Sequence, residues 1–528
     1  MMSLGLWWIG YTAGLATFPP FDLADIVIRL SPGEVATWAI ANFQFNAQRL
    51  ALLGGIIAWL VLGALLALIL RERPGAKTGA IIGIAVAPLA VILAFGSNEA
   101  SGVGYGIWLL IWFEATLAGP LALAGSWIER LALDARDRSQ MTAQGGWLDQ
   151  PASRDRRDVL KNAVGGALAL GLGGWIVGSL LRRSGAIEVE TAAGQPLEDV
   201  RTGLEATPGA EGSAPAFPTS EPAAEDVDDF DAPPGVRPVI TSNKDFYTID
   251  ISTRDPVIPA EQWTLKVTGL VDQELEITYN DLLSMPSIEL PGTLMCVSFT
   301  YGSELISNTH WTGVRLRDVL QMAGIGDGAV ELVLQGAGGY SDSIPIAKGL
   351  EATTLLAYGM NGETLPSGHG YPCRLYVPNI YGEKNVKWLE EIQVVDFEYT
   401  GFWQERGWDA ANEEAVINII SIIDTPPGEV TSDESGTVPV GGVAFAGSRG
   451  LQSVLIQVDE GDWVEAIVEP YEPELVWQRW KYDWLAEPGE HTLTVKAIDG
   501  KGNEQVVAEK PPYPDGMTGL HEVSVQVL

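Results

Sequence analysis

Four apolar runs in the first third of the chain are each close to the length of a membrane-spanning helix. A helix of about 20 apolar residues crosses the hydrocarbon core of a bilayer. A shorter run over Ser3–Phe18 is a fifth candidate. We therefore predict an α-helical membrane bundle of about five helices over residues 1–183. The four longer runs are Leu50–Leu70, Gly79–Phe95, Val103–Ala124 and Asn162–Leu181.

Basic residues between these runs predict the orientation of the bundle. The loop after Leu70 carries Arg71, Arg73 and Lys77, the loop over 96–102 carries no basic residue, and the loop over 125–161 is again rich in arginine. Short cytoplasmic loops of membrane proteins are enriched in lysine and arginine. Everything after Leu181 is therefore expected on the extracytoplasmic side of the cell membrane, behind a multi-pass anchor.

The stretch Ser153-Arg154-Asp155-Arg156-Arg157 precedes the last apolar run and resembles a twin-arginine export signal. Because no small-residue cleavage site follows promptly, we expect it to stay in place as an anchor. The alternative is a plain basic flank of a membrane helix. Glu114 is the one acid near the middle of a run, and an ionisable group at that depth is a functional candidate. Pairing inside the bundle is an equally good reading.

Residues 184–237 are predicted to be a disordered linker. Between Glu188 and Asp231 the sequence has twelve acids and one basic residue, Arg201. Such a stretch cannot bury enough apolar surface to fold, so a solvated tether is expected. The whole chain is also acidic, with 68 acids against 32 basic residues and a formal charge of −36. Nucleic acid is therefore excluded as a partner, since no basic stripe neutralises phosphates.

Residues 238–410 read as an α+β domain, because short strands and helices alternate without a βαβ period. Tyr279 begins a predicted helix with a capping side chain. Leu316, Val319, Leu320 and Ala323 recur at helical spacing before a stop at Gly324. Predicted strands cover Trp263–Val267, Leu275–Thr278 and Val330–Leu334.

Residues 411–528 read as an all-β, immunoglobulin-like sandwich. Apolar residues alternate along three short segments that are separated by turn signals. We expect three tryptophans, Trp477, Trp480 and Trp484, to fill its core. The alternating sets are Val454, Ile456 and Val458, then Leu493, Val495 and Ala497, then Val523, Val525 and Val527.

Cys296 is the main candidate for a functional residue in the α+β domain. A lone cysteine cannot build a zinc site, but it can supply one soft thiolate to a metal that is held mainly by something else. The alternative is a buried free cysteine that packs as a small apolar group. The sequence blocks around Cys296 bear on the choice between these two roles. They are Gly292–Phe299, His310–Leu320, Gly339–Ile346, Leu356–Glu363, His369–Leu375 and Gly382–Leu389.

These blocks, in this order, resemble the sulfite oxidase family of molybdopterin-dependent oxidoreductases. The resemblance implies a molybdenum–molybdopterin cofactor, with tungsten as an alternative metal, and a small-molecule substrate. It implies that Cys296 is the protein thiolate on the metal and that Tyr340 lies on the substrate side. The implied cofactor contacts are Asn243, Phe246, Tyr247, His369, Arg374, Asn385, Val386 and Lys387. In this reading Arg374 and Lys387 hold the phosphate end.

The resemblance has departures that bear on the substrate. Typical sulfite oxidases have an arginine where this chain has Tyr301, and another where it has Ile249 and Asp250. Without these arginines a small dianion loses its bidentate partners. Periplasmic methionine sulfoxide reductase subunits share the fold and also lack that pocket. Reduction of an S- or N-oxide is therefore an alternative to oxidation, and a metal-free scaffold that retains the fold is a third reading.

The positions of the histidines and cysteines in the sequence bear on electron transfer. All of them lie after the last apolar run, so the predicted spans contain no ligands for haem or an iron–sulfur cluster. We expect no such centre and a separate electron-transfer partner. Residues 411–528 also resemble the dimerisation domain of the family, which implies a homodimer formed through this domain.

Overall fold

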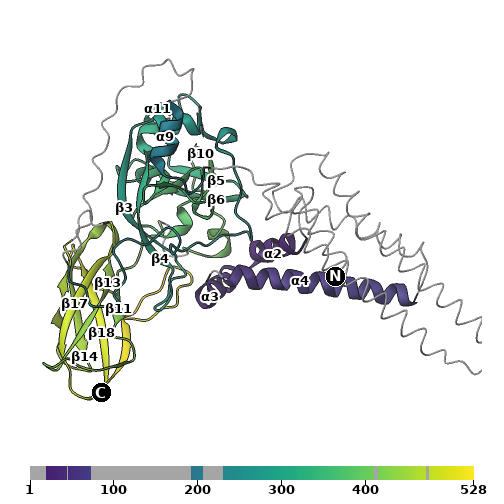
Figure 1. Ribbon diagram of the computed structural model, residues 1–528. Helices are drawn as coiled ribbons and strands as arrows, with labels where there is room; N and C mark the ends of the chain where they lie inside the picture. Colours follow the sequence, from purple (N-terminus) through teal and green to yellow (C-terminus); the bar gives the residue numbers. More distant parts are fainter. Residues whose placement is uncertain (1–18, 45, 73–191, 206–229, 410–413, 471–474) are drawn as a thin grey trace, which may run out of the picture. The chain divides into compact units, whose positions relative to one another are not determined.

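The computed structural model describes residues 19–44, 46–72, 192–205, 230–409, 414–470 and 475–528 (Figure 1). They belong to two compact units. The first contains α2 (Pro19–Leu30), α4 (Asn46–Glu72) and the short segment Asp250–Arg254. The second contains α3 (Gly33–Phe43) and the rest of the described chain.

In the first unit, hydrogen bonds tie the segment Asp250–Arg254 to the two helices. The amide of Thr253 donates to Asp25 over 2.7 Å. Gln48 donates to the backbone oxygens of Asp250 and Ser252, each over 3.1 Å. The segment is thereby fixed to α2 and to α4.

The predicted membrane bundle is not confirmed. Within the described ranges, no helix combines the length and the apolar composition needed to cross a bilayer. Of the predicted spans, only Leu50–Leu70 falls on a described helix, α4. The other four lie outside the described residues, as do Glu114 and the twin-arginine-like stretch.

The α+β prediction for the middle of the chain is confirmed. One five-stranded sheet has the order β2-β1-β10-β5-β6, in which β1 and β10 are parallel. A second sheet has the order β3-β4-β7-β8, and β9 pairs with β7. The strands are β1 (Thr264–Gly269), β2 (Leu275–Thr278), β3 (Ser287–Met295), β4 (Ile306–Arg315), β5 (Glu331–Gly336), β6 (Tyr340–Pro345), β7 (Leu355–Met360), β8 (Glu363–Thr364), β9 (Arg374–Tyr376) and β10 (Leu389–Val395).

Three α-helices accompany these sheets: α10 (Tyr279–Ser284), α11 (Leu316–Ala323) and α12 (Ile346–Gly349). Thr278 caps α10, because its hydroxyl accepts from the Asp281 amide while the Asp281 carboxylate accepts from the Thr278 amide. The apolar stripe of α11 is fully buried, as its spacing predicts. Gly324 ends α11 with a φ of 69°, a conformation that favours glycine.

The C-terminal part is a sandwich of two sheets. Their orders are β11-β13-β17-β16 and β12-β19-β18-β14-β15. The predicted alternation is confirmed, since Val454, Val495 and Val525 are fully buried in the shared core. The strands are β11 (Ile420–Thr425), β12 (Glu429–Val430), β13 (Thr437–Phe445), β14 (Leu451–Val458), β15 (Val464–Glu465), β16 (Ile467–Val468), β17 (Gln478–Leu485), β18 (Gly489–Asp499) and β19 (His521–Val527).

The predicted tryptophans divide into two groups. Trp480 and Trp484 are in the sandwich core, as expected. Trp477 is buried too, but its amide donates to the Thr293 hydroxyl on β3 over 3.1 Å. It therefore links the sandwich to the α+β part instead of filling the core.

Two described parts of the predicted linker, residues 192–205 and 230–237, pack against the fold, which corrects the prediction for these residues. Residues 197–205 form α9 (Leu197–Glu205), and Leu197 is buried in the α+β core. Arg201 donates to the hydroxyls of Ser287 and Tyr358. Near the other end, Arg237 forms an ion pair with Asp424 on β11. Leu197, Arg201 and Arg237 therefore attach these two described parts to the rest of the fold.

Candidate active site

Cys296 follows directly after the last residue of β3. The β3–β4 pairing ends at Met295 and Ile306, so Cys296 begins the loop that joins these strands. Its amide donates to the Leu305 oxygen over 2.9 Å, and its own oxygen accepts from the Phe299 amide over 3.0 Å. The side chain is buried. Burial, together with the nearby charge of Glu383, raises the pKa of the thiol to about 12.

Two of the predicted cofactor contacts, Asn243 and Phe246, lie against a third, His369. The imidazole Nε2 lies 3.1 Å from the Asn243 carbonyl oxygen, and the Phe246 ring stands edge-on to the imidazole. Because a carbonyl only accepts, Nε2 must carry the proton. Burial and the charges of Lys387 and Arg374 lower the pKa of His369 to about 3, so the ring is neutral at physiological pH.

Arg374 ties two of the predicted loops together. Its guanidinium donates to the backbone oxygens of His369 and Asn385, each over 3.1 Å, and lies over the Trp311 ring. The ammonium of Lys387 donates to the Gly368 oxygen over 2.9 Å. Both cations therefore hold the backbone of the loop around His369. Their predicted phosphate contact stays a prediction.

Asn385 and Val386 are hydrogen-bonded to β9 and to the residues that follow β9 in the sequence. The Asn385 side chain accepts from the Val377 amide over 2.7 Å and donates to the Tyr381 oxygen over 3.0 Å. The Val386 oxygen accepts from the Leu375 amide over 2.9 Å, and the Val386 side chain is buried. The structure thus links the predicted blocks around Asn243, His369, Arg374 and Lys387.

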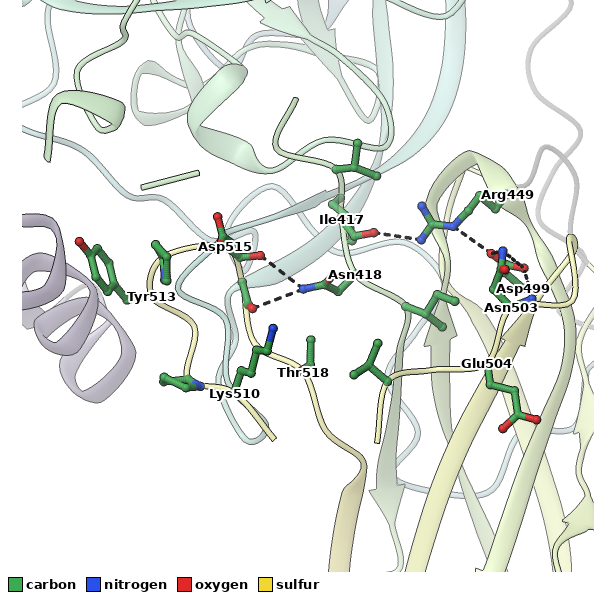
Figure 2. A pocket seen from close by; sticks show the side chains of 16 residues that line it. Ile417, Asn418, Arg449, Asp499, Asn503, Glu504, Lys510, Tyr513, Asp515 and Thr518 are labelled. Carbon is green, nitrogen blue, oxygen red and sulfur yellow. Dashed lines mark hydrogen bonds and ion pairs between the residues drawn. The ribbon is translucent and has the colours of Figure 1, made fainter. Parts of the chain in front are cut away.

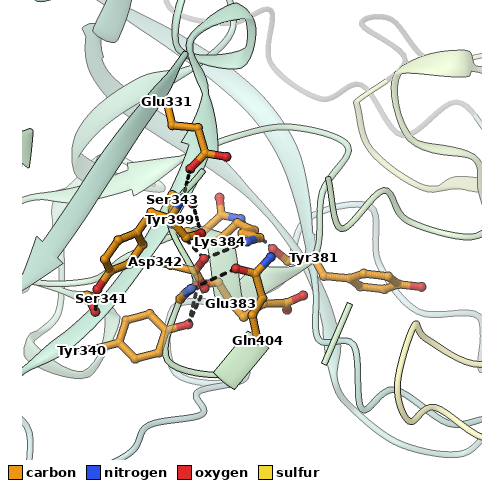
Figure 3. A network of polar contacts seen from close by, with 12 residues as sticks. Glu331, Tyr340, Ser341, Asp342, Ser343, Tyr381, Glu383, Lys384, Tyr399 and Gln404 are labelled. Carbon is orange, nitrogen blue, oxygen red and sulfur yellow. Dashed lines mark hydrogen bonds and ion pairs between the residues drawn. The ribbon is translucent and has the colours of Figure 1, made fainter. Parts of the chain in front are cut away.

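Tyr340, the predicted substrate-side residue, belongs to a polar network at the start of β6 (Figure 3). Its hydroxyl donates to the Glu383 backbone oxygen over 2.7 Å, and Asp342 Oδ2 lies 3.2 Å away. Asp342 also pairs with Lys384 over 2.7 Å. Burial, then the carboxyls of Asp342 and Glu383, raise the pKa of Tyr340 well above its usual value. The hydroxyl is therefore protonated and can donate.

Buried polar atoms near Cys296 fit a polar cofactor. In the part of the chain that the structure describes, the Tyr247 hydroxyl is buried and has no hydrogen-bond partner. The amide and hydroxyl of Ser298 lie against the Cys296 thiol and lower its pKa, although burial outweighs them. The Tyr247 hydroxyl faces Gly382, where an added Cβ would lie 2.9 Å from it. Ser298 is two residues from Cys296. A soft thiolate ligand near a buried hydroxyl that lacks a partner suits a metal on a hydrogen-bonding organic cofactor.

Within the described ranges no group of three or more histidine, cysteine, aspartate or glutamate residues could hold a metal ion. The metal-ligand role of Cys296 stays a prediction. Cys373, the other cysteine, is also buried, and its thiol lies 3.8 Å from the Arg374 backbone oxygen.

Sequence reasoning missed Glu383 and Asp409. Both are buried, at 8% and 3% exposure. Glu383 is part of the predicted block Gly382–Leu389. Its charge and its position next to the predicted cofactor contacts could have pointed to it. Asp409 had no such signal, because it stands far from that block in the sequence.

Tyr301, where typical sulfite oxidases have an arginine, faces the sandwich. Its hydroxyl donates to the Gly519 oxygen over 2.9 Å and accepts from Gln505 over 3.0 Å. Its ring stacks on His521 with 4.5 Å between centroids. Tyr301 therefore serves as a link between the α+β part and the sandwich.

A pocket of about 560 Å³ lies beside the sandwich (Figure 2). Arg449 in its wall pairs with Asp499 over 3.2 Å and donates to the Ile417 oxygen over 2.9 Å. Asn418 donates to the Met517 oxygen over 3.1 Å. No predicted site residue is among the described residues that line it. Its walls are built from groups that already stabilise the sandwich.

Comparison with known proteins shows the family to which the chain belongs. The family model of the oxidoreductase molybdopterin binding domain matches residues 252–403. Mouse mitochondrial sulfite oxidase is 31% identical over 55% of this chain and 62% of its own length. The NADH nitrate reductase of Volvox carteri is 29% identical over 43% of this chain and 33% of its own length.

A shorter relative is covered more completely. The uncharacterized oxidoreductase YuiH of Bacillus subtilis is 35% identical over 28% of this chain and 72% of its own length. The chain therefore belongs to the family of molybdopterin-binding oxidoreductases, with a domain of the sulfite oxidase type. It spans less than two thirds of the mouse sulfite oxidase that it matches.

Proposed function

We propose that this protein is a molybdenum-dependent oxidoreductase that transfers an oxygen atom to or from a small substrate, with Cys296 as the protein ligand of the metal. The observation that carries the proposal is the buried thiol of Cys296 near the buried Tyr247 hydroxyl, which lacks a partner among the described residues. When bound, the cofactor supplies two-electron oxygen-atom transfer, and the protein positions it.

The roles of the other residues follow from their contacts. Asn243, His369 and Arg374 hold the loops that would surround the pterin, through the bonds from His369 to Asn243 and from Arg374 to Asn385. Tyr340 presents a hydroxyl that stays protonated. The proposed metal is molybdenum, and tungsten is the alternative.

The surroundings of Cys296 favour a neutral substrate over a small dianion. Tyr301, at the position of the missing arginine, bonds to Gly519 and stacks on His521. Lys384 is paired with Asp342, and Glu383 brings a carboxyl close enough to raise the Cys296 pKa. A dianion would therefore lack a bidentate arginine at the Tyr301 position, and the ammonium of Lys384 is already paired. Reduction of an S- or N-oxide is therefore our second candidate.

A turnover assay separates these reactions. The enzyme is purified from a host that makes the cofactor and supplied with an oxidised dye and sulfite, or with a reduced dye and methionine sulfoxide. Turnover with either substrate supports oxygen-atom transfer, and the faster one sets the direction. Loss of that turnover in Cys296→Ser, with retention in Cys373→Ser, is expected. No turnover with any oxyanion, sulfoxide or N-oxide would count against the proposal and leave the metal-free scaffold.

We also propose where the enzyme is located and how it is oriented. Residues 1–183 anchor it in the cell membrane, and residues 238–410 and 411–528 act on the extracytoplasmic side. The apolar runs and the arginine-rich loops of the sequence support this orientation. Electrons pass to a separate partner, and the sandwich forms a homodimer. Protease digestion of intact and permeabilised cells tests the orientation, since exposure only after permeabilisation would contradict it.

A further inference from the structure

Residues 192–205 form a strap that is hydrogen-bonded to β8. The hydroxyl of Thr364 on β8 accepts from the Gln195 amide over 3.0 Å and donates to the Ala192 oxygen. The Thr364 amide donates to the Gln195 oxygen over 2.8 Å. Thr364 is fully buried, so water does not compete for these bonds while the strap is in place.

Leu197 and Arg201 anchor the strap to β7 and β3. The Leu197 amide donates to the Gly362 oxygen over 3.0 Å, and the Leu197 side chain is buried. Gly359 on β7 leaves room for this side chain, because an added Cβ would lie 2.5 Å from Leu197 Cδ1. Arg201 donates to the Ser287 hydroxyl over 2.9 Å. Because one buried apolar side chain and a few hydrogen bonds hold the strap, it can detach at a lower cost than global unfolding.

The strap contacts a tight turn that joins β7 to β8. Met360 at the end of β7 pairs with Glu363 at the start of β8. The two residues between them, Asn361 and Gly362, have φ angles of 49° and 77°. Two successive residues with positive φ define the hairpin turn for which Asn-Gly is the preferred sequence. The turn therefore fixes where the side chains of Asn361 and Glu363 lie.

The same turn holds Asn243, one of the predicted cofactor contacts. The side-chain oxygen of Asn243 accepts from the Asn361 side chain over 2.9 Å. Its side-chain nitrogen donates to Glu363 Oε2 over 2.9 Å and to the Met360 oxygen over 3.2 Å. Both N–H donors of this side chain are thus used by the turn. The Asn243 backbone oxygen faces His369, so the turn positions Asn243 and, through it, the imidazole of His369.

The segment 241–247, which contains Asn243, is also attached to β4. The Thr241 amide donates to the Asn308 oxygen over 2.9 Å, and the Tyr247 amide donates to the Ser307 hydroxyl over 3.3 Å. These bonds do not involve the turn. A turn that loses the strap should therefore loosen the segment around Asn243 without removing it from the fold.

We propose that the strap retains the pterin cofactor by holding the β7–β8 turn against Asn243, an inference that rests on the proposed function. Thr364 is the positioning residue that joins the strap to the turn. While the strap is in place, Asn243 and His369 are fixed around the cofactor. When it detaches, both gain freedom and the cofactor can enter or leave. The strap follows the proposed membrane domain in the sequence, so the chain that leaves the anchor also closes the cofactor site.

Hydrogen–deuterium exchange of the metal-free, full-length protein tests whether the strap acts on Asn243. Thr364→Val keeps the size of the side chain and removes its hydroxyl bonds to the strap. We expect backbone amides to exchange roughly tenfold faster both in the strap and in residues 241–247, where the Phe246 amide is bonded to the Ser242 oxygen. Thr364→Ser keeps the hydroxyl and should restore slow exchange in both regions.

Thr518→Val is the matched control, because the Thr518 hydroxyl donates to the Ala508 oxygen over 2.6 Å in the C-terminal part. It should leave the exchange of residues 241–247 unchanged. Faster exchange in Thr364→Val that is confined to the strap, or no change in either region, would overturn the proposal. Arg201→Gln weakens the strap without altering the turn residues and gives the same decision if Thr364→Val fails to fold.

Release of molybdenum separates this proposal from the proposed function. Protein from a host that makes the cofactor is kept in metal-free buffer, and the molybdenum that stays with the chain is measured over time. We expect release roughly tenfold faster from Thr364→Val than from wild type, and the wild-type rate in Thr364→Ser. Equal rates in wild type and Thr364→Val would overturn the strap and leave the proposed function standing. Absence of molybdenum from wild type would overturn the proposed function, while the exchange data still decide whether the strap acts on Asn243.

Discussion

Lys384 and Asp342 form an ion pair whose Nζ and Oδ1 atoms are 2.7 Å apart, with side-chain exposures of 3% and 1%. The pair joins η4 (Gly382–Lys384) to β6, the two elements that carry Glu383 and Tyr340. Asp342 also accepts from the Ser343 amide over 2.8 Å. The buried charge of Asp342 is thus balanced by one specific cation.

Replacing that cation should destabilise the fold. Lys384→Met leaves Asp342 buried without its partner, which costs roughly 3–5 kcal/mol in comparable pairs. Urea unfolding followed by tryptophan fluorescence measures the loss. The matched control is Lys496→Met, whose partner Glu504 is 57% exposed, and which should cost at most about 1 kcal/mol. Equal losses in the two variants would show that burial of the Lys384 pair is irrelevant.

Arg374→Lys should loosen the loops around the proposed cofactor. A lysine ammonium cannot reach the His369 and Asn385 oxygens at once, whereas the guanidinium does so with bonds of 3.1 Å. We expect a loss of roughly 1.5–3 kcal/mol and a lower cofactor content after purification. Unfolding and metal analysis check the two effects. Arg317→Lys, at a 37% exposed arginine, is the control and should change neither.

His521 should make the folded chain sensitive to acid. Its Nδ1 accepts from the Ile423 amide over 2.9 Å, and burial lowers its pKa to about 4. The unfolded state binds the proton at about pH 6.5. The contribution of His521 to the free energy of unfolding should therefore fall as pH decreases from about 6.5 to about 4.

His521→Gln should reduce that pH dependence without abolishing it, because glutamine does not titrate in this range while His369, whose pKa is also lowered, still does. His491→Gln is the control. His491 is hydrogen-bonded to the exposed carboxylate of Asp459, which raises its pKa, so its replacement leaves the acid dependence in place. Thermal melts between pH 4 and pH 8 measure the slopes. The same slope in His521→Gln and wild type would contradict the assignment.

Leu197→Ala tests whether the start of the acidic stretch is part of the fold. The Leu197 side chain is buried against the α+β core, so its truncation should cost roughly 2–5 kcal/mol. Asp199→Ala, at an exposed position of the same helix, should change little. Chemical unfolding distinguishes the two. An unchanged free energy of unfolding in Leu197→Ala would instead support the disordered linker that composition predicts.

The regular elements of the fold could be predicted because their apolar residues repeat with a clear period. Leu316, Val319 and Leu320 define one face of α11, and Leu493, Val495 and Ala497 define one face of β18. Burial follows directly from such spacing. The resemblance of several blocks in order then located Cys296 and the loops around it.

The remaining features depend on contacts that no local pattern contains. Leu197 is one apolar residue in an acidic stretch, so composition predicts disorder although the core accepts its side chain. Asp409 meets Glu383 only through the tertiary fold. The stacking of Tyr301 on His521 joins residues of the α+β part and the sandwich.

The central claim is that Cys296 binds the metal of a molybdopterin cofactor. Metal analysis of wild type, Cys296→Ser and Cys373→Ser, all matured in a host that makes the cofactor, tests it most directly. We predict about one molybdenum per chain in wild type and in Cys373→Ser, and loss of the thiolate-to-metal absorption band in Cys296→Ser. The same metal content and spectrum in Cys296→Ser as in wild type, or neither molybdenum nor tungsten in wild type, would contradict the claim.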